Sequence, residues 1–235
     1  IARARFSKPE VGSLEALATH LARQYVDRMP RNGKAFDFAR EIAVPFPLRL
    51  MMHILGLPEA DDPLILKLAS GLTGAEDPSR ALSDHPAESI RLAGVGFREY
   101  FNKVTADRRQ QPKADLSSMI ANACVFGKPI ADYERLSYFM QLAIAGQENT
   151  AYSIAGGLHA LLEHPDQMKK LVGKPTLLES AVEEILRWTS PGRHLVRTAT
   201  ADTKVGDQRI RAGEAVALFF ASANRDETVF ASAHT

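Results

Sequence analysis

The sequence has a single cysteine, 7% aromatic residues, almost no net charge and no long hydrophobic run. One thiol, Cys124, excludes a disulfide within the chain, which favours a reducing cytoplasm. Lys and Arg number 29 against 28 Asp and Glu, and no basic stripe carries interleaved aromatic residues, which argues against nucleic acid as the main partner. The longest apolar runs, such as residues 216–221, are far shorter than the roughly 20 residues that cross a bilayer. We therefore expect a soluble cytoplasmic protein without a membrane span.

Hydrophobic residues make up 45% of the 235, enough to bury a core, and their spacing predicts a mainly α fold with a small β portion. The expected helices lie over residues 14–25, 47–55, 59–72, 87–109, 132–163 and 176–188, with a shorter one after Asp115. The expected strands lie at 194–200, 203–205, 208–210 and 215–220. We expect a single incomplete domain over residues 1–235, helical over 1–190 and mostly short strands over 191–235.

Two polar positions are expected to cap helices. Asp115 precedes a short apolar run, where its carboxylate can accept a hydrogen bond from an otherwise unpaired backbone N–H group. Thr176 and Glu179 have the spacing of a capping box, in which the two side chains satisfy such groups reciprocally.

The helix expected over residues 132–163 is interrupted by four consecutive polar residues after a glycine. Glu148, in the interruption, has apolar residues on its own helical face, so we expect its carboxylate to lie largely buried among apolar groups. A buried carboxylate needs a partner or serves chemistry. Gly146 has no side chain and would let a bulky group approach the helix closely. The alternative is a buried glutamate paired with a distant arginine, with Gly146 present only for packing.

A second charged pattern, Glu184-Ile185-Leu186-Arg187, places an acid and a base three residues apart on one side of the last predicted helix. A surface pair of this kind contributes roughly 0.2–0.5 kcal/mol to helix stability, and charged helices produce the pattern constantly. The pattern alone therefore predicts no function.

In this order, the patterns resemble those of bacterial cytochromes P-450, the haem-thiolate monooxygenases. Ala145-Gly146-Gln147-Glu148-Asn149-Thr150 is similar to the oxygen-activation motif of that family, which lies in a helix passing over the haem. A later stretch of the same family is similar to residues 181–188 followed by Pro191 and Arg197-Thr198-Ala199. The family segment that leads to the haem-ligand loop is similar to residues 224–226. The resemblance covers nearly the whole sequence and implies the central part of the P-450 fold, including its long central helix.

The resemblance implies catalytic and cofactor-binding roles on the long helix. Glu148 would be the acid of a proton relay to bound dioxygen, with Ala145 and Gly146 beside the haem. The family usually has Thr after the acid, where this chain has Asn149. An amide can donate one hydrogen bond and accept another, so Asn149 can still position a water, but it cannot rotate a hydroxyl proton. Thr150 also belongs to the candidate catalytic group, although it lies about 100° further around the helix and is a poor substitute by geometry.

The resemblance implies further roles after the long helix. Glu184 and Arg187 would form a structural pair on the proximal side of the haem. Arg197 would bind a haem propionate, because a guanidinium fork suits a carboxylate, and His194 would reach a propionate or face the substrate. An exposed strand arginine and a simply packed histidine are the alternatives.

The implied enzyme binds haem and inserts one oxygen atom of O2 into a small apolar substrate, such as a steroid, a terpenoid or a fatty acid. Its electrons would come from NAD(P)H through a ferredoxin-type or flavin redox partner.

The cysteine that ligates the iron in this family lies in a loop beyond the residues present, and Cys124 does not match it. We expect Cys124 to be an ordinary small apolar residue and assign no metal ligand in this sequence. Residues 5–9 resemble the end of a helix that follows an N-terminal haem-binding motif. We therefore expect an internal fragment of a longer enzyme, inactive by itself. One alternative is a haem-free remnant that acts as a binding or scaffold protein, and another is a haem protein ligated through one of the seven histidines.

Overall fold

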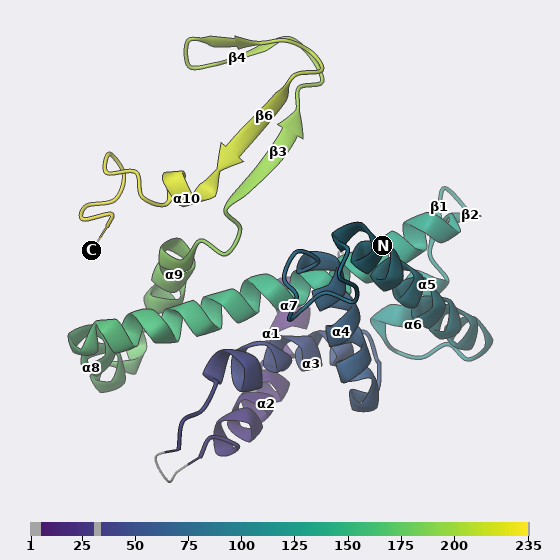
Figure 1. Cartoon of the computed structure of the whole chain (residues 1–235), viewed down its shortest axis with the longest axis horizontal. Coiled ribbons are helices and arrows are strands. Elements are labelled where there is room, and N and C mark those ends of the chain that lie inside the picture. The colour runs from purple at the N-terminus through teal and green to yellow at the C-terminus, as the bar shows by residue number, and fades with distance from the viewer. Residues whose placement is uncertain (1–5, 31–33, 235) are drawn as a thin grey trace. The chain divides into compact units, whose positions relative to one another are not determined.

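The computed structural model describes residues 6–30 and 34–234, which fall into two compact units, one ending at Ala151 and one beginning at Tyr152. Figure 1 labels most of their helices and strands. Arg5, in the segment compared above with a family helix end, lies outside the described residues.

The first unit is almost entirely helical. Its elements are α1 (Lys8–Gly12), α2 (Glu15–Asp27), the π-helical turn η2 (Ala39–Ala43), α3 (Pro45–Ile54), the 3-10 turn η3 (Glu59–Asp61), α4 (Asp62–Thr73), α5 (Pro86–Gln110), α6 (Leu116–Ala121), β1 (Cys124–Val125), β2 (Lys128–Pro129) and the first part of α7 (Asp132–Glu163). β1 and β2 pair as a short antiparallel hairpin.

Aromatic packing between α5 and α7 fixes which face of α7 is buried. Phe97 and Phe101 of α5 and Phe139 of α7 are at most 1% exposed. The ring of Phe101 stacks on both others, with centroids 6.0 Å from Phe97 and 4.6 Å from Phe139. Each buried phenylalanine contributes about 1.5–3 kcal/mol. Phe139 and Ala143 face this core. The opposite side of α7 therefore lies at the surface of the unit.

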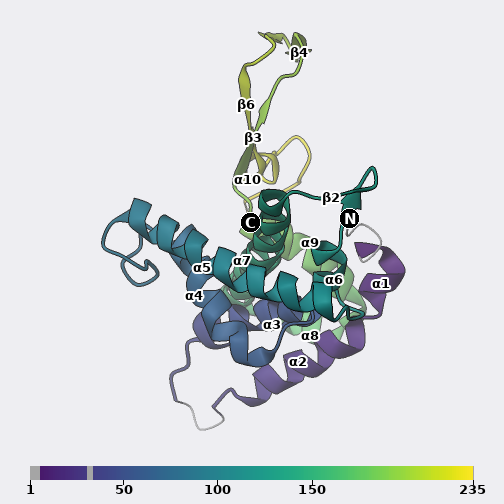
Figure 2. The same ribbon diagram turned by 90° about the vertical axis from the view of Figure 1, so that its right-hand side faces the viewer.

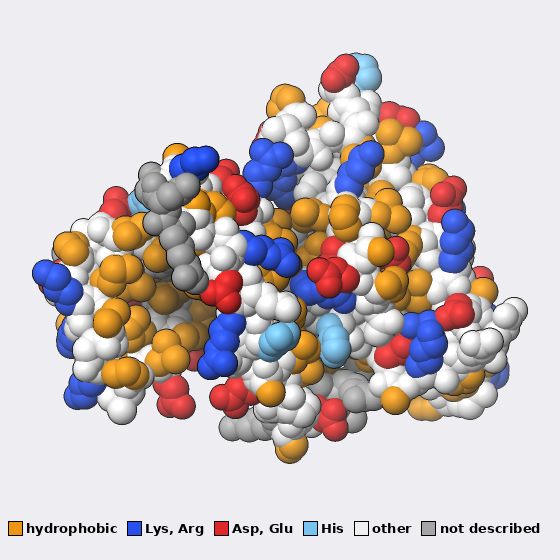
Figure 3. Space-filling view, turned by 90° about the horizontal axis from the view of Figure 1, so that it is seen from below, with side chains coloured by type: hydrophobic (Ala, Val, Ile, Leu, Met, Phe, Trp, Pro, Cys, Tyr) orange, Lys and Arg blue, Asp and Glu red, His pale blue; other side chains and the backbone are white. Residues whose placement is uncertain are grey.

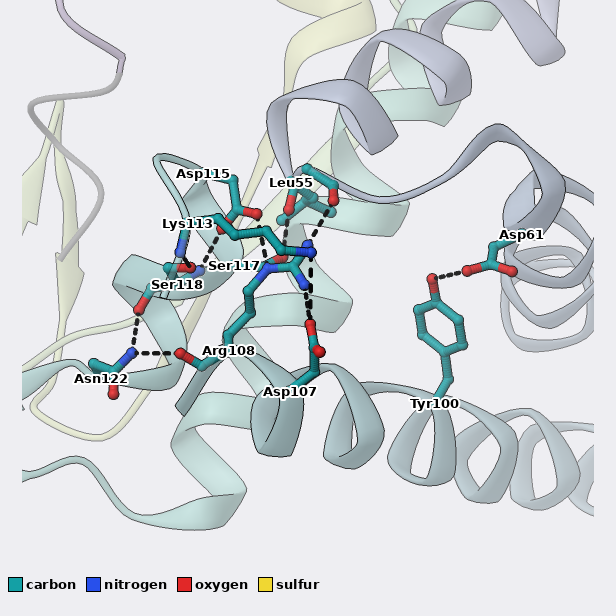
Figure 4. Close-up of polar contacts among 11 residues, drawn as sticks. Leu55, Asp61, Tyr100, Asp107, Arg108, Lys113, Asp115, Ser117, Ser118 and Asn122 are labelled. Atoms are coloured by element: carbon teal, nitrogen blue, oxygen red, sulfur yellow. Dashed lines mark hydrogen bonds and ion pairs between the residues drawn. The ribbon is translucent and has the colours of Figure 1, made fainter. Parts of the chain in front are cut away.

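A buried arginine, Arg108, joins three segments of the first unit (Figure 4). Its Nε donates to Asp115 at 2.8 Å and its Nη2 to the carbonyl of Gly56 at 2.7 Å, while Nη1 contacts Asp107. Asp115 also accepts a hydrogen bond from the backbone N–H of Ser118 at 2.7 Å, which confirms it as the N-cap of α6. Gly56 has a φ of +70°, and a Cβ at this position would collide with the Asp115 side chain. The cluster therefore ties the turn after α3 to α5 and α6.

The second unit contains the end of α7, two further helices and two β-ribbons. After α7 come α8 (Pro165–Gly173), the 3-10 turn η4 (Pro175–Leu177), α9 (Leu178–Thr189), β3 (His194–Thr198), β4 (Thr203–Val205), β5 (Gln208–Ile210), β6 (Ala215–Phe219) and α10 (Phe220–Ala223). β3 and β6 run side by side and antiparallel, with His194 opposite Phe219 and Arg197 opposite Val216 (Figures 1 and 2). β4 and β5 form a separate hairpin.

The structure confirms the predicted mainly α fold with a small β portion, and it corrects several details. Thr176 does not cap α9, because it lies inside a 3-10 turn and Leu177 occupies the N-cap without a side-chain hydrogen bond. Neither the helix α8 nor the β1–β2 hairpin was among the predicted elements. Cys124 in that hairpin is exposed, not packed as a small apolar residue.

On the face shown in Figure 3, acidic and basic side chains are interspersed among apolar ones. Within residues 6–30 and 34–234, no helix combines the length and hydrophobicity needed to cross a membrane.

Candidate functional site

The predicted oxygen-activation turn lies on a continuous stretch of α7 with one exposed and one buried stripe. Gln141, Ala145 and Asn149, each four residues apart, are exposed. Ala143 and Gln147, on the opposite side, are buried. Since residues four apart share a face, Ala145, implied to lie beside the cofactor, and Asn149, implied to be catalytic, lie on the same surface of the helix.

Glu148 is engaged by two polar residues of the first unit. Its Oε1 accepts a hydrogen bond from Arg80 Nη2 at 2.8 Å and lies 2.5 Å from Thr73 Oγ1. The side chain remains 23% exposed, so the expectation of a carboxylate largely buried among apolar groups was wrong. Arg80 is the distant arginine of the alternative explanation. Sequence gave no sign of Arg80, because it lies 68 residues earlier in a loop without a motif.

Gly146 and Thr150 contribute to the helix itself. The position that a Cβ would take on Gly146 is filled by the side chain of Met51 from α3, so the close approach at this glycine comes from a packed helix. Thr150 Oγ1 donates to the carbonyl of Gly146 at 3.4 Å, a long hydrogen bond of the kind expected for a hydroxyl within a helix. Contact of Gly146 with a cofactor therefore stays a prediction.

In the second unit, Glu184 and Arg187 form more than a surface pair. Arg187 Nε and Nη2 donate to the two carboxylate oxygens of Glu184 at 2.7 and 2.6 Å. The Nη1 group donates to the carbonyls of Asn224 at 2.7 Å and Ala233 at 3.0 Å. Hydrogen bonding by Arg187 lowers the pKa of Glu184. The guanidinium therefore holds the segment after β6 against α9, in agreement with a structural role.

Small residues of α7 allow α9 to approach closely and so place this pair. A Cβ on Gly157 would lie 2.7 Å from Ile185 Cγ2, and one on Gly156 would lie 2.8 Å from Thr189 Cγ2. A cavity of about 500 Å³ opens beside this contact, between the end of α7, α8 and α9, and Glu184 and Trp188 are among its lining residues.

His194 and Arg197 both lie on β3 and are exposed. The imidazole of His194 packs against the ring of Phe219, with centroids 5.8 Å apart. Arg197 donates to the carbonyl of Val196 at 3.0 Å, and its guanidinium reaches the surface of the ribbon. Both side chains are accessible to a carboxylate ligand. Binding of a haem propionate by Arg197, and of a propionate or the substrate by His194, therefore stays a prediction.

These residues fit a haem in part. Ala145 and Asn149 form a surface of small side chains suited to a flat macrocycle, and the exposed guanidinium of Arg197 suits a propionate. An axial thiolate has no counterpart, because the single cysteine lies in the β1–β2 hairpin. Among the residues that the structure describes, no three His, Cys, Asp or Glu side chains gather as a metal site.

Comparison with known proteins places this fold. Residues 89–235 match the family Cytochrome P450. Cytochrome P450-terp of Pseudomonas sp. is 35% identical over 234 residues, which are 97% of this chain and 55% of that protein. The steroid C26-monooxygenase of Mycolicibacterium smegmatis is 35% identical over 209 residues, 87% of this chain and 50% of that protein. The structure of Mycobacterium marinum cytochrome P450 CYP268A2 in complex with pseudoionone superposes with a TM-score of 0.93 at 34% identity, covering 98% of this chain and 56% of that one.

The mainly helical fold with its long helix α7 is thus the fold of a cytochrome P450. The chain belongs to the cytochrome P450 family. It spans about half the length of the relatives that it matches.

Proposed function

We propose that the full-length protein is a haem-dependent monooxygenase that inserts one oxygen atom of O2 into a small apolar substrate. The observation that carries the proposal is the α7 turn, where the anchored carboxylate of Glu148 adjoins the exposed amide of Asn149. A haem bound through a cysteine thiolate would supply the activation of dioxygen.

The chain's own residues would position water and move protons. Glu148 would take up a proton from solvent and pass it on, because its carboxylate is partly exposed yet fixed in place. Asn149 would hold a water by donating one hydrogen bond and accepting another, with Ala145 leaving room beside it. Thr150 donates to the Gly146 carbonyl and would support the turn without moving the proton.

Residues of the second unit would bind the cofactor and maintain the fold. Arg197 would pair with a haem propionate and His194 would reach the same group or the substrate. Arg187, paired with Glu184, would keep the segment after β6 in place through its hydrogen bonds to the carbonyls of Asn224 and Ala233. We propose a cytoplasmic enzyme that receives electrons from NAD(P)H through a ferredoxin-type or flavin redox partner.

We propose an apolar substrate of terpenoid, steroid or fatty-acid type, and the names of the relatives support the first two of these classes. One relative is a steroid C26-monooxygenase, and one structural relative was solved with pseudoionone. Pseudoionone is therefore a suitable first probe of binding.

The proposal is tested by the absorption spectrum of the full-length protein, reduced and exposed to carbon monoxide. We expect the red-shifted Soret band of a thiolate-ligated haem. A soluble protein without any haem band would contradict the proposal and favour a haem-free binding or scaffold protein. A carbon monoxide band at the position typical of histidine ligation would favour a haem protein ligated through a histidine.

A further inference from the structure

One face of the ribbon formed by β3 and β6 carries two arginines. Side chains alternate between the two faces of a strand, so Leu195 and Arg197 share a face, and Arg193, directly before β3, falls in the same alternation. The backbone of Arg193 is attached to the start of α10, since its carbonyl accepts a hydrogen bond from the N–H of Ala221 at 3.3 Å. The register places Leu218 opposite Leu195. This face therefore carries two guanidinium groups with an apolar cross-strand pair between them.

The apolar pair between the arginines is open to solvent. Leu195 is 46% exposed and Leu218 is 43% exposed. Single exposed apolar side chains are ordinary at a protein surface, but these two lie side by side across the strands and between two cations. Such a surface is complementary to a molecule that has both hydrocarbon and an acidic group.

Neither arginine has an acidic partner within the part of the chain that the structure describes. Arg197 donates to the carbonyl of Val196 at 3.0 Å, and neither it nor Arg193 forms an ion pair there. The hairpin of β4 and β5 differs, because Arg209 pairs with Asp202 at 3.3 Å. Both guanidinium groups of the ribbon are exposed, so their donors remain available to a carboxylate from outside.

The two cations are far enough apart to bind different groups. Four residues of extended strand at roughly 3.3 Å each separate their Cα atoms by about 13 Å. In the proposed function Arg197 pairs with a haem propionate, which leaves Arg193 for a second carboxylate. A guanidinium fork binds both oxygens of a carboxylate, and the adjoining pair of Leu195 and Leu218 suits a hydrocarbon chain attached to it.

We propose that Arg193 is a specificity-determining residue that binds the carboxylate of the substrate, and that the hydrocarbon of the substrate lies on Leu195 and Leu218. The substrate class is then a lipophilic carboxylic acid, such as a fatty acid. This inference rests on the proposed monooxygenase function and narrows the class of its substrate.

Calorimetric titration of the full-length protein with dodecanoic acid and with dodecan-1-ol tests the proposal. The two probes have chains of the same length, and only the acid is charged at neutral pH. Wild-type protein is expected to bind the acid about tenfold more tightly than the alcohol, because the charged pair adds a strong hydrogen bond. Arg193→Met should bind the acid about tenfold more weakly and the alcohol unchanged. Arg193→Lys should keep most of the preference, because the ammonium keeps the charge.

Three further variants show which group each residue binds. Arg209→Met is the matched control, the same substitution at an exposed arginine of the neighbouring hairpin, and should bind both probes as the wild type does. Leu195→Ser should weaken binding of both probes equally, since it removes apolar contact and no charge. Arg197→Met should lower the haem content and keep the preference for the acid.

The outcomes separate this proposal from the proposed function. Equal binding of acid and alcohol by the wild type, or a preference for the acid that survives in Arg193→Met, would overturn the role of Arg193 and leave the monooxygenase function standing. Haem loss in Arg193→Met as large as in Arg197→Met would assign Arg193 to the cofactor and also overturn it. A full-length protein without a thiolate-type Soret band would remove the proposed function, and with it the assignment of the acid as substrate.

Discussion

Replacing Arg187 by Met is expected to lower the free energy of unfolding of the full-length protein by about 3 kcal/mol and to release the segment after β6. The Arg187 side chain is only 10% exposed, and its donors go to Glu184 and to the carbonyls of Asn224 and Ala233. Its guanidinium also lies 5.3 Å from the centre of the Phe230 ring. Met fills similar space but donates nothing, so both carbonyls lose their partner.

Chemical denaturation and proteolysis of residues 224–233 check this prediction. Glu184→Gln is the matched comparison, because Glu184 is 57% exposed and an exposed partner contributes about 1 kcal/mol or less. A loss of less than about 1 kcal/mol in Arg187→Met would show that this arginine does not hold the segment.

Replacing Arg108 by Met is expected to cost about 3–5 kcal/mol, the largest loss that we expect from a single polar residue. Arg108 is 5% exposed, and its removal leaves the Asp115 carboxylate, itself 11% exposed, without its cation. The carbonyl of Gly56 loses a hydrogen bond at the same time. Burying an unpaired carboxylate costs more free energy than the ion pair itself contributes to stability. The expected loss of stability is large for this reason.

The reason for this loss is tested by a second substitution. Adding Asp115→Asn to Arg108→Met removes the stranded charge but keeps a side-chain oxygen for the cap on Ser118, so the double variant should recover part of the stability. Arg98→Met, at an exposed position of the same helix, is the control and should change stability by less than about 0.5 kcal/mol. A double variant that is no more stable than Arg108→Met would show that charge burial is not the cause.

Local patterns predicted the elements of this fold well. The strands β4 and β5 have the predicted bounds, because the intervening Gly206, at a φ of +58°, favours a tight turn. Asp115 caps α6 as expected, since capping involves only the next few residues. Thr176 failed as a cap because the preceding prolyl segment forms a 3-10 turn, which the sequence spacing does not reveal.

The partners of the site residues were not predictable in the same way. Arg80 meets Glu148 only because α4, the following loop and α7 pack together, and nothing near either residue in the sequence marks the contact. Arg187 binds backbone carbonyls 37 and 46 residues away, and carbonyls carry no sequence signature. The order of the charged patterns along the sequence indicated the family. The contacts that these charged residues make could be identified only in the folded structure.

The central claim, that the Glu148–Asn149 turn of α7 delivers protons in a monooxygenase, is tested most directly by the peroxide released per NADH oxidised in the full-length protein. Asn149→Ala is expected to raise this ratio about fivefold, the effect of losing one hydrogen bond of about 1 kcal/mol to a positioned water. Ser137→Ala, an exposed substitution three turns earlier on α7, should leave the ratio unchanged. An unchanged ratio in Asn149→Ala would contradict the assignment of this turn.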